Sequence, residues 1–292
     1  MNEAQEKELD VLKEVIKIIE KHKLSYFAIG GTCIGAVRHK GFIPWDDDID
    51  IIMPRNDYEL FRTKLYKELP EFCEKNDGEC SKSNYFNFIK IYDKNTSLIS
   101  DYAVDYPDFY TGAFVDIMPV DGIYDNILLQ KITIYRNLLI QRLNVLIRYG
   151  CDGNDLKSLL KKAIYKALSN VNYNYFDSLL TKLSMRNNYE KSNYICFTWR
   201  ISKKLPFSRK VFKKDYFEYY INVPFEDTTI RVPKKYNEYL KQDFGNYLEI
   251  PNESEQNSGH IIVVSDMNMP IEYYVNNSKI VVEMFRGMKH EK

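Results

Sequence analysis

The acidic run at positions 46–50 constrains this chain of 292 residues more than any other feature of its sequence. The run leads directly into an apolar stretch of the kind that forms β-strands, and Asp50 lies between Ile49 and Ile51. Because side chains two apart on a strand share a face, Asp48 and Asp50 should lie side by side while the isoleucines face the core. Carboxylates held this close repel one another unless a cation or a proton neutralises them.

Such a pair of oxygen ligands on a rigid strand suits a divalent metal ion. Mg²⁺ prefers hard oxygen ligands and usually completes its coordination shell with substrate phosphates, so a phosphate-bearing substrate is implied. Mn²⁺ suits the same ligands. The alternative interpretation is a solvated acidic turn without chemistry, but Asp50 lies inside an apolar strand, where a solvated turn does not extend.

A third carboxylate is expected from a neighbouring strand, because one pair of ligands does not normally hold two metal ions or activate a nucleophile. Asp116 stands within the apolar stretch 114–118, where a carboxylate is costly unless a metal or a cation neutralises it. An aspartate that merely caps a turn at the end of a strand is the alternative, and Asp121 suits it better. We therefore predict that Asp48, Asp50 and Asp116 are metal ligands and catalytic residues.

A glycine pair ahead of the acidic run supplies a second part of the expected site. A β-prone stretch ends at Gly30 and Gly31, whose missing side chains would let backbone N–H groups approach a phosphate. Thr32 is expected to cap a short helix that runs to about His39. Arg38 is expected to offset charge that develops in the reaction. The residues expected to bind the donor phosphate are Gly30, Gly31, Thr32, His39 and Lys40, with ordinary turn and surface roles as the alternative.

The hydrophobic pattern predicts an α/β (α+β) protein with a mixed sheet flanked by helices. About the first 122 residues hold the sheet, after which the chain turns helical through about position 183 and then becomes rich in Tyr and Phe. The expected elements are a helix at 4–23, a strand at 25–29, a strand from 49 that Pro54 stops, a helix at 58–69 capped by Asn56 or Asp57, a strand at 86–92, and a strand at 113–120 closed by Pro119 and by Asp121 with Gly122. The division expected is 1–122 and 123–292, unless the chain forms one compact domain.

The composition excludes several classes of protein. The 41 basic residues balance 41 acidic ones, so no overall positive field favours a nucleic acid and a charged ligand must be bound locally. The longest apolar runs are far shorter than the roughly 18–20 residues that cross a bilayer, and the acidic N-terminus is unlike a secretion signal. Five cysteines without a CxxC pair suit free thiols in the cytoplasm, with a zinc site at Cys73 and Cys80 as the alternative.

Residues 29–50 resemble the signature of the LicD family of phosphocholine-type transferases, a branch of the nucleotidyltransferase fold that also includes the fukutin-related proteins. The matching residues are 29–32 and the unbroken run 35–50, followed by 53–55, 115–122, 230–233, Tyr236, 243–247, Pro251 and His260. The family commonly has Tyr-Gly-Asp where this chain has Phe244, Gly245 and Asn246, so we assign Asn246 no role.

The resemblance implies a nucleotidyltransferase-like core at 1–122 and an acceptor-binding region at 123–292. It implies transfer of a substituted phosphate, such as phosphocholine, from a CDP-alcohol to a hydroxyl of a cell-surface glycan or teichoic-acid precursor, with release of CMP. CDP-choline is the favoured donor. Asp48 and Asp50 would hold Mg²⁺ against the donor pyrophosphate, and Asp116 would bind metal and help to deprotonate the acceptor. The stretch 124–220 carries no matching motif, so acceptor specificity is free to vary there.

Two other functions are weighed against this one. The same fold could act as a true nucleotidyltransferase that uses a nucleoside triphosphate and releases pyrophosphate, and the leaving group distinguishes the two enzymes. The third function is a non-catalytic nucleotide-binding module, against which the presence of all three candidate carboxylates argues.

The segment 128–148 is strongly apolar, and basic residues interrupt it at Lys131, Arg136, Arg142 and Arg148. A basic amphipathic helix can contact a membrane surface peripherally, where lipid-linked glycan acceptors are found. We favour the simpler interpretation, in which this helix packs on the protein's own core.

Overall fold

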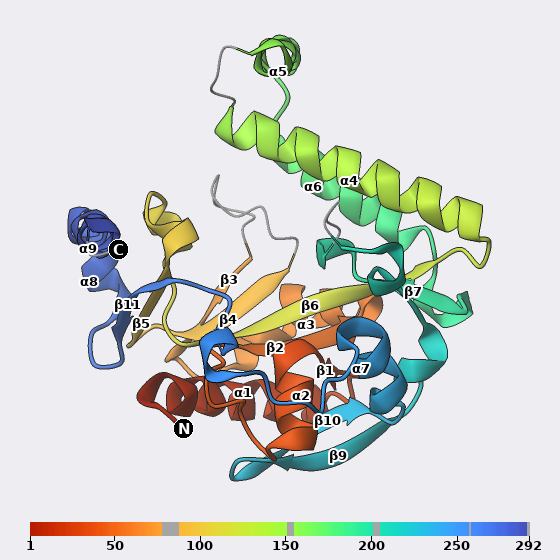
Figure 1. The fold of residues 1–292 in the computed structure, drawn as a ribbon, viewed down its shortest axis with the longest axis vertical. Coiled ribbons are helices and arrows are strands. Elements are labelled where there is room, and N and C mark those ends of the chain that lie inside the picture. Colours follow the sequence, from red (N-terminus) through yellow and green to blue (C-terminus); the bar gives the residue numbers. More distant parts are fainter. Residues whose placement is uncertain (78–87, 151–154, 201–204, 257, 291–292) are drawn as a thin grey trace. The chain divides into compact units, whose positions relative to one another are not determined.

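The computed structural model describes residues 1–77, 88–150, 155–200, 205–256 and 258–290 (Figure 1). Its contacts divide the chain into two compact units. The first consists of Met1–Asp77, Phe88–Pro119 and Asp215–Lys292, so segments from both ends of the chain belong to it. Most of the second unit is the intervening stretch Val120–Lys214.

The first unit is built on a sheet with the strand order β1-β2-β6-β4-β3. Its strands are β1 (Phe27–Ala28), β2 (Ile49–Pro54), β3 (Cys73–Asn76), β4 (Ile89–Asp93) and β6 (Phe114–Ile123), the last of which continues into the second unit. Two further antiparallel pairs join β5 (Ser97–Ser100) to β11 (Ile262–Asp266) and β9 (Tyr220–Phe225) to β10 (Thr228–Pro233). The helices are α1 (Glu3–Lys21), α2 (Gly30–Arg38), α3 (Arg55–Thr63), α7 (Tyr236–Phe244), α8 (Ile271–Asn276) and α9 (Ser278–His290). The expected α+β class is confirmed.

Helix α1 forms where the hydrophobic pattern predicts it. Asn2 and Gln5 close a capping box at its start, since each side chain accepts a hydrogen bond from the backbone N–H of the other. One face is apolar and buried, and α1 packs against β4. The apolar residues of this face are Leu9, Val11, Leu12, Val15, Ile16, Ile18 and Ile19.

Helix α2 begins earlier than predicted, at Gly30, with Ile29 as its N-cap residue. Thr32 therefore lies within the first turn and does not cap the helix. Its hydroxyl oxygen instead accepts a hydrogen bond from the backbone N–H of Asp50 at 2.8 Å. The Thr32 side chain therefore links α2 to β2 and does not cap the helix.

Helix α3 also differs from the prediction at both ends. It follows β2 without a loop and ends at Thr63, and a short 3₁₀ helix (Leu65–Glu68) covers part of the rest of the expected span. Pro54 occupies the N-cap position, so neither Asn56 nor Asp57 caps α3. The Asp57 carboxylate accepts a hydrogen bond from the backbone N–H of Ser25 at 2.8 Å.

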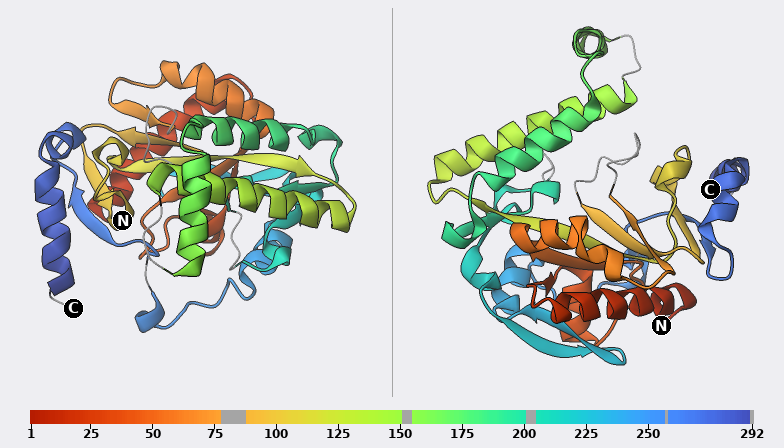
Figure 2. Two further views of the ribbon diagram at one scale, coloured as in Figure 1. Left: turned by 90° about the horizontal axis from the view of Figure 1, so that it is seen from above. Right: turned by 180° about the vertical axis from the view of Figure 1, so that it is seen from behind.

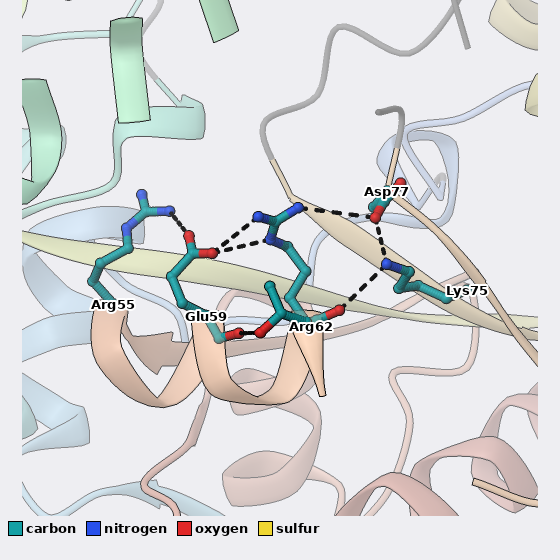
Figure 3. Close-up of polar contacts among 6 residues, drawn as sticks. Arg55, Glu59, Arg62, Lys75 and Asp77 are labelled. Carbon is teal, nitrogen blue, oxygen red and sulfur yellow. Dashed lines mark hydrogen bonds and ion pairs between the residues drawn. The ribbon is translucent and has the colours of Figure 1, made fainter. Parts of the chain in front are cut away.

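Ion pairs attach α3 to the end of β3 (Figure 3). On α3, the Glu59 carboxylate accepts hydrogen bonds from Arg55 and Arg62 at 3.1 Å each. Arg62 and Lys75 both contact the carboxylate of Asp77, and Lys75 also donates to the backbone carbonyl of Arg62 at 3.3 Å. This network stabilises the helix that directly continues β2, the strand that follows the acidic run and contains Asp50.

Strand β6 is longer than predicted, because it continues past Pro119 to Ile123. Pro119 lies between the residues that pair with β4 and those that pair with β7, so its missing N–H interrupts neither ladder. Strand β4 confirms the β-rich stretch from position 89 onward, while positions 86 and 87 of that prediction lie outside the described residues.

The second unit is mainly helical. Strand β7 (Tyr194–Cys196) pairs with the end of β6 and with β8 (Val211–Lys213). Helices α4 (Ile127–Tyr149) and α6 (Tyr173–Met185) pack together, and α5 (Leu156–Ala167) crosses them near the end of α4 (Figure 2). Among the described residues, no helix is both long and apolar enough to span a bilayer.

One face of α4 packs on the core of the second unit, as predicted for the segment 128–148. Ile134 and Leu138 contribute to a cluster with Ile123, and Ile140 and Ile147 contribute to a second cluster with side chains of α6.

The cysteines agree with the expectation of free thiols as far as the structure describes them. Cys33 and Cys196 are buried, and Cys73 is half-buried; all three are unpaired. Cys80 and Cys151 lie outside the described residues, and so does the zinc site suggested for Cys73 and Cys80.

Candidate active site

The acidic run leads into β2 and is tied to the glycine turn. Asp50 lies on the strand, but Asp48, which the sequence placed on the same strand, precedes it because β2 begins at Ile49. The backbone N–H of Asp50 donates to the Thr32 hydroxyl, and the Asp50 carbonyl accepts a hydrogen bond from the backbone N–H of Ile29 at 3.1 Å. Ile49 and Ile51 are fully buried, as the strand alternation predicts. These contacts hold the Asp50 carboxylate on the opposite face of the strand from the core isoleucines.

The carboxylates of this run raise one another's pKa. Burial is the main cause, followed by the neighbouring negative charges. The pKa of Asp46 rises to about 7 and that of Asp48 to about 8, while the pKa of Asp50 lies well above its ordinary value. Asp116 on β6 contributes to the shifts of Asp48 and Asp50. The structure therefore brings together the three carboxylates predicted from the sequence, and adds Asp46.

Asp116 forms a buried ion pair with Lys90, which lies directly opposite it on β4. The Lys90 ammonium donates to both carboxylate oxygens, at 2.7 and 2.9 Å, and lies 3.5 Å from the centre of the Phe114 ring. Burial opposes the charge on Lys90, but Asp116 outweighs it, so the pKa of Lys90 is raised. The Lys90 ammonium is thus a buried positive charge next to the carboxylates of the site.

His260 approaches the acidic run from the segment before β11. Its Nδ1 atom lies 3.2 Å from Oδ1 of Asp47 and 4.0 Å from Oδ2 of Asp48. The hydrogen bond with Asp47 is the main reason why the pKa of His260 is raised. Possible ligand atoms of Asp47, Asp48 and His260 all lie within 4.8 Å of one another, and the second carboxylate oxygen of Asp47 is buried without a hydrogen-bond partner.

A further carboxyl group, that of Glu8 on α1, is completely buried. Neither of its oxygens has a hydrogen-bond partner. Burial raises its pKa well above the ordinary value, and the charges of Asp48, Asp47 and Asp46 raise it further. Gln5, one turn earlier, donates from its side chain to the backbone carbonyl of Asp46 at 2.9 Å. Helix α1 therefore supports the acidic run from within the fold.

The glycine pair allows the carboxylates to come close to α2. Gly30 has a φ of +57°, which favours glycine, and its N–H donates to the Tyr239 hydroxyl at 3.1 Å. A Cβ atom at Gly31 would lie 2.3 Å from Oδ2 of Asp46, and one at Gly30 would lie 3.2 Å from Oδ2 of Asp50. Gly30, Gly31 and Thr32 thus lie at the acidic run, where the sequence predicted phosphate contacts.

The three predicted cations lie in different surroundings. Arg38 donates to the backbone carbonyls of Tyr247 and Glu249, at 2.7 and 3.1 Å, so its guanidinium holds a distant segment of the chain. His39 packs edge-on against the Trp45 ring, and burial lowers its pKa. The Lys40 side chain is exposed. These contacts give Arg38 a structural partner that the sequence did not reveal.

The donor set of this site fits a hard divalent cation. It offers carboxylate oxygens from Asp46 and Asp48 just before β2, from Asp50 on β2 and from Asp116 on the neighbouring strand β6, and their mutual repulsion is relieved by a bound cation or by protons. Lys90 and Glu8, like Asp46, were not among the site residues predicted from the sequence. The signals were weak: a lysine among apolar residues on a strand, and a glutamate on the apolar face of a helix.

The chain is similar to a known protein family and to several known proteins. Residues 23–130 match the family model described as "LicD/FKTN/FKRP, nucleotidyltransferase domain". The chain is 30% identical over 258 residues to the lipopolysaccharide cholinephosphotransferase LicD of Haemophilus influenzae, which covers 87% of this chain and 93% of that protein. A stretch of 62 residues is 37% identical to uncharacterized proteins of Rickettsia prowazekii and Rickettsia typhi, covering 21% of this chain and 22% and 19% of theirs. The chain therefore belongs to the LicD family, as its motif at residues 29–50 predicted.

Proposed function

We propose that this protein transfers phosphocholine from CDP-choline to a hydroxyl of a cell-surface glycan, such as a lipopolysaccharide or a teichoic-acid precursor, and releases CMP. The observation that carries the proposal is the 30% identity, over most of both chains, to a lipopolysaccharide cholinephosphotransferase. The buried carboxylate cluster at the matching motif supports it, because carboxylates placed together can hold the divalent cation that neutralises a pyrophosphate during phosphoryl transfer.

In the proposed reaction, the acceptor oxygen forms a bond to the phosphorus that carries choline. The bond between that phosphorus and the oxygen bridging to CMP breaks, and CMP leaves with the electron pair. The proton of the acceptor hydroxyl passes to a base of the protein. Positioning and charge neutralisation therefore carry most of the catalysis, since the protein itself forms no covalent bond.

Asp46, Asp48 and Asp50 would hold Mg²⁺ or Mn²⁺, with Asp116 as a further ligand. A bound divalent cation would neutralise the pyrophosphate of the donor and favour departure of CMP. Burial raises the pKa of Asp116 and the Lys90 ammonium opposes that rise; Lys90 also fixes the two carboxylate oxygens, which suits a ligand that must keep one orientation. The missing side chains of Gly30 and Gly31 leave room for the carboxylates of Asp46 and Asp50 beside α2.

Two groups are proposed to accept the acceptor proton. Asp116 was proposed from the sequence, and burial raises its pKa, but both of its carboxylate oxygens already accept hydrogen bonds from the Lys90 ammonium. The geometry of His260 suits the role better, because a hydrogen bond from Nδ1 to Asp47 would orient the ring and leave Nε2 to accept a proton. Replacing His260 with Asn should lower kcat more than KM and remove the acidic limb of the pH–rate profile. An unchanged profile would indicate that Asp116, and not His260, accepts the proton.

The leaving group tests the proposed function. The protein is incubated with Mg²⁺, a glycan acceptor and either CDP-choline or CTP, and the products are separated by anion-exchange chromatography. We expect CDP-choline to yield CMP in proportion to the choline transferred. The Asp48→Asn variant should release no CMP. The control variant Asp10→Asn, which makes the same change at an exposed aspartate on α1, should release CMP as the unchanged protein does. Pyrophosphate released from CTP, with no CMP from CDP-choline, would instead identify a nucleotidyltransferase.

A further inference from the structure

Helix α4 exposes apolar residues along a continuous stripe. Leu128, Ile132, Tyr135 and Leu139 follow one another at spacings of four, three and four residues, which places them on one face of a helix. Their side chains are 54%, 60%, 67% and 58% exposed. This stripe is distinct from the face of α4 that packs on the core.

The opposite side of α4 is unusually polar for a buried face. The buried polar residues of this helix are Gln130, Thr133, Asn137, Asn144 and Arg148. A helix of a water-exposed protein normally turns its polar face to solvent and its apolar face to the core. In α4 the solvent-facing stripe is the more apolar one, which marks it as a contact surface.

Helix α5 is shorter than α4 and also exposes apolar side chains. It contains four lysines and no acidic residue, and its hydrophobic residues are interleaved with them. Leu159 and Leu160 are 53% and 65% exposed, and Tyr165 is exposed as well. Lysines that flank leucine and tyrosine on a short amphipathic helix are typical of helices that lie in a membrane interface.

The charge of this segment identifies the kind of partner. Residues 126–186 contain ten Lys and Arg but only three Asp, although the whole chain is neutral. Lys131 and Arg142 flank the α4 stripe, and both are exposed. A surface that combines exposed leucine, isoleucine and tyrosine with excess positive charge is complementary to anionic headgroups over acyl chains. A symmetric contact with the same face of a second copy would bring the excess positive charges together.

We infer that the α4 stripe and α5 together form a docking surface for an anionic lipid bilayer. The surface holds the protein at the membrane by partial burial of its apolar side chains, while the lysines reach the headgroups. Docking does not rest on the proposed reaction, because no residue of the acidic cluster contributes to it.

Vesicle sedimentation without nucleotide or glycan tests the inference. The full chain is mixed with vesicles of phosphatidylcholine alone, or with one part phosphatidylglycerol to two parts phosphatidylcholine. We expect at least tenfold stronger binding to the anionic vesicles at about 0.1 M salt, and weaker binding at about 1 M salt, where the Debye length falls from about 10 to about 3 Å. Equal binding to both vesicles, or none, would overturn the inference.

Matched variants locate the surface. Leu159→Ser with Leu160→Ser should lower the affinity for anionic vesicles at least tenfold. The control is Leu248→Ser with Ile250→Ser in the first unit. It changes two aliphatic side chains that are 59% and 57% exposed, which is similar to the exposure of Leu159 and Leu160. The control should bind vesicles as the unchanged protein does. Equal loss of binding in both double variants would refute the assignment to α5.

Charge and stripe variants complete the test. Lys161→Glu with Lys162→Glu should abolish the preference for anionic lipid, and Ile132→Ser with Leu139→Ser should weaken binding to both vesicle types. Each variant should unfold within about 2 °C of the unchanged protein, because the residues are exposed. A large loss of thermal stability in Ile132→Ser with Leu139→Ser, or dissociation of a dimer in the ultracentrifuge, would show that the protein itself covers this face and would overturn the inference.

Discussion

Replacing Asp48 with Asn should change how the stability of the metal-free protein depends on pH. Folding raises the pKa of Asp48 to about 8, against about 3.9 in an unfolded chain. The folded state therefore binds a proton that the unfolded state has lost, and the contribution to the free energy of unfolding is complete below pH about 4 and disappears as the pH rises toward 8. The slope of one such group reaches about 1.4 kcal/mol per pH unit.

Between pH 5 and pH 7 this slope amounts to about 2.7 kcal/mol for a fully buried group. The Asp48 side chain is 17% exposed, so solvent screens part of the effect and about 2 kcal/mol is the better expectation. Urea unfolding in EDTA at pH 5, 6 and 7 measures it. The unchanged protein should lose about 2 kcal/mol more than Asp48→Asn over this range, while the variant gains stability at pH 7. Parallel curves for the two proteins would refute the reasoning.

Three further predictions follow from the same site. Lys90→Met leaves the buried Asp116 carboxylate without its partner, so it should cost about 3–5 kcal/mol in urea unfolding at pH 7, and a loss below about 1 kcal/mol would contradict the buried ion pair. Gly31→Ala places a Cβ atom 2.3 Å from Oδ2 of Asp46, so metal affinity measured by calorimetry should fall at least tenfold, and unchanged affinity would argue against the close approach. Glu8→Gln removes a buried ionisable carboxyl group whose raised pKa costs stability as the pH rises, so the variant should melt higher than the unchanged protein at pH 8 but not at pH 5, and the reverse order would show that Glu8 is ionised and compensated.

The local features of the fold could be predicted because they depend on near neighbours. The alternation around Asp50 was sufficient to separate its carboxylate from the buried Ile49 and Ile51. The errors arose where tertiary contacts replaced local rules. Thr32 suits a helix cap by type, but the helix begins at Gly30, a glycine with positive φ, three residues earlier than a Thr32 cap would start it, and this leaves the hydroxyl for β2. Pro119 suits the end of a strand, yet β6 continues past it, because Pro119 lies between the residues that pair with β4 and those that pair with β7.

The long-range parts of the site could not be predicted from the sequence. Arg38 is separated from its partners Tyr247 and Glu249 by more than 200 residues, and no local pattern links them. The pair between Lys90 and Asp116 depends on the register of two strands, and a shift of one residue would separate the two side chains. Asp48 and Asp50 could nonetheless be grouped from the sequence, because the family motif that contains them lies in one contiguous stretch.

The most direct test of the central claim is the binding of CDP-choline to the unchanged protein and to Asp48→Asn, measured by calorimetry with Mg²⁺ and with EDTA. We expect CDP-choline to bind more strongly than CTP in Mg²⁺, and its affinity to fall at least tenfold in EDTA or in the variant. Equal affinity with and without the cation, or in Asp48→Asn, would contradict the assignment of the acidic run as a metal-dependent donor site.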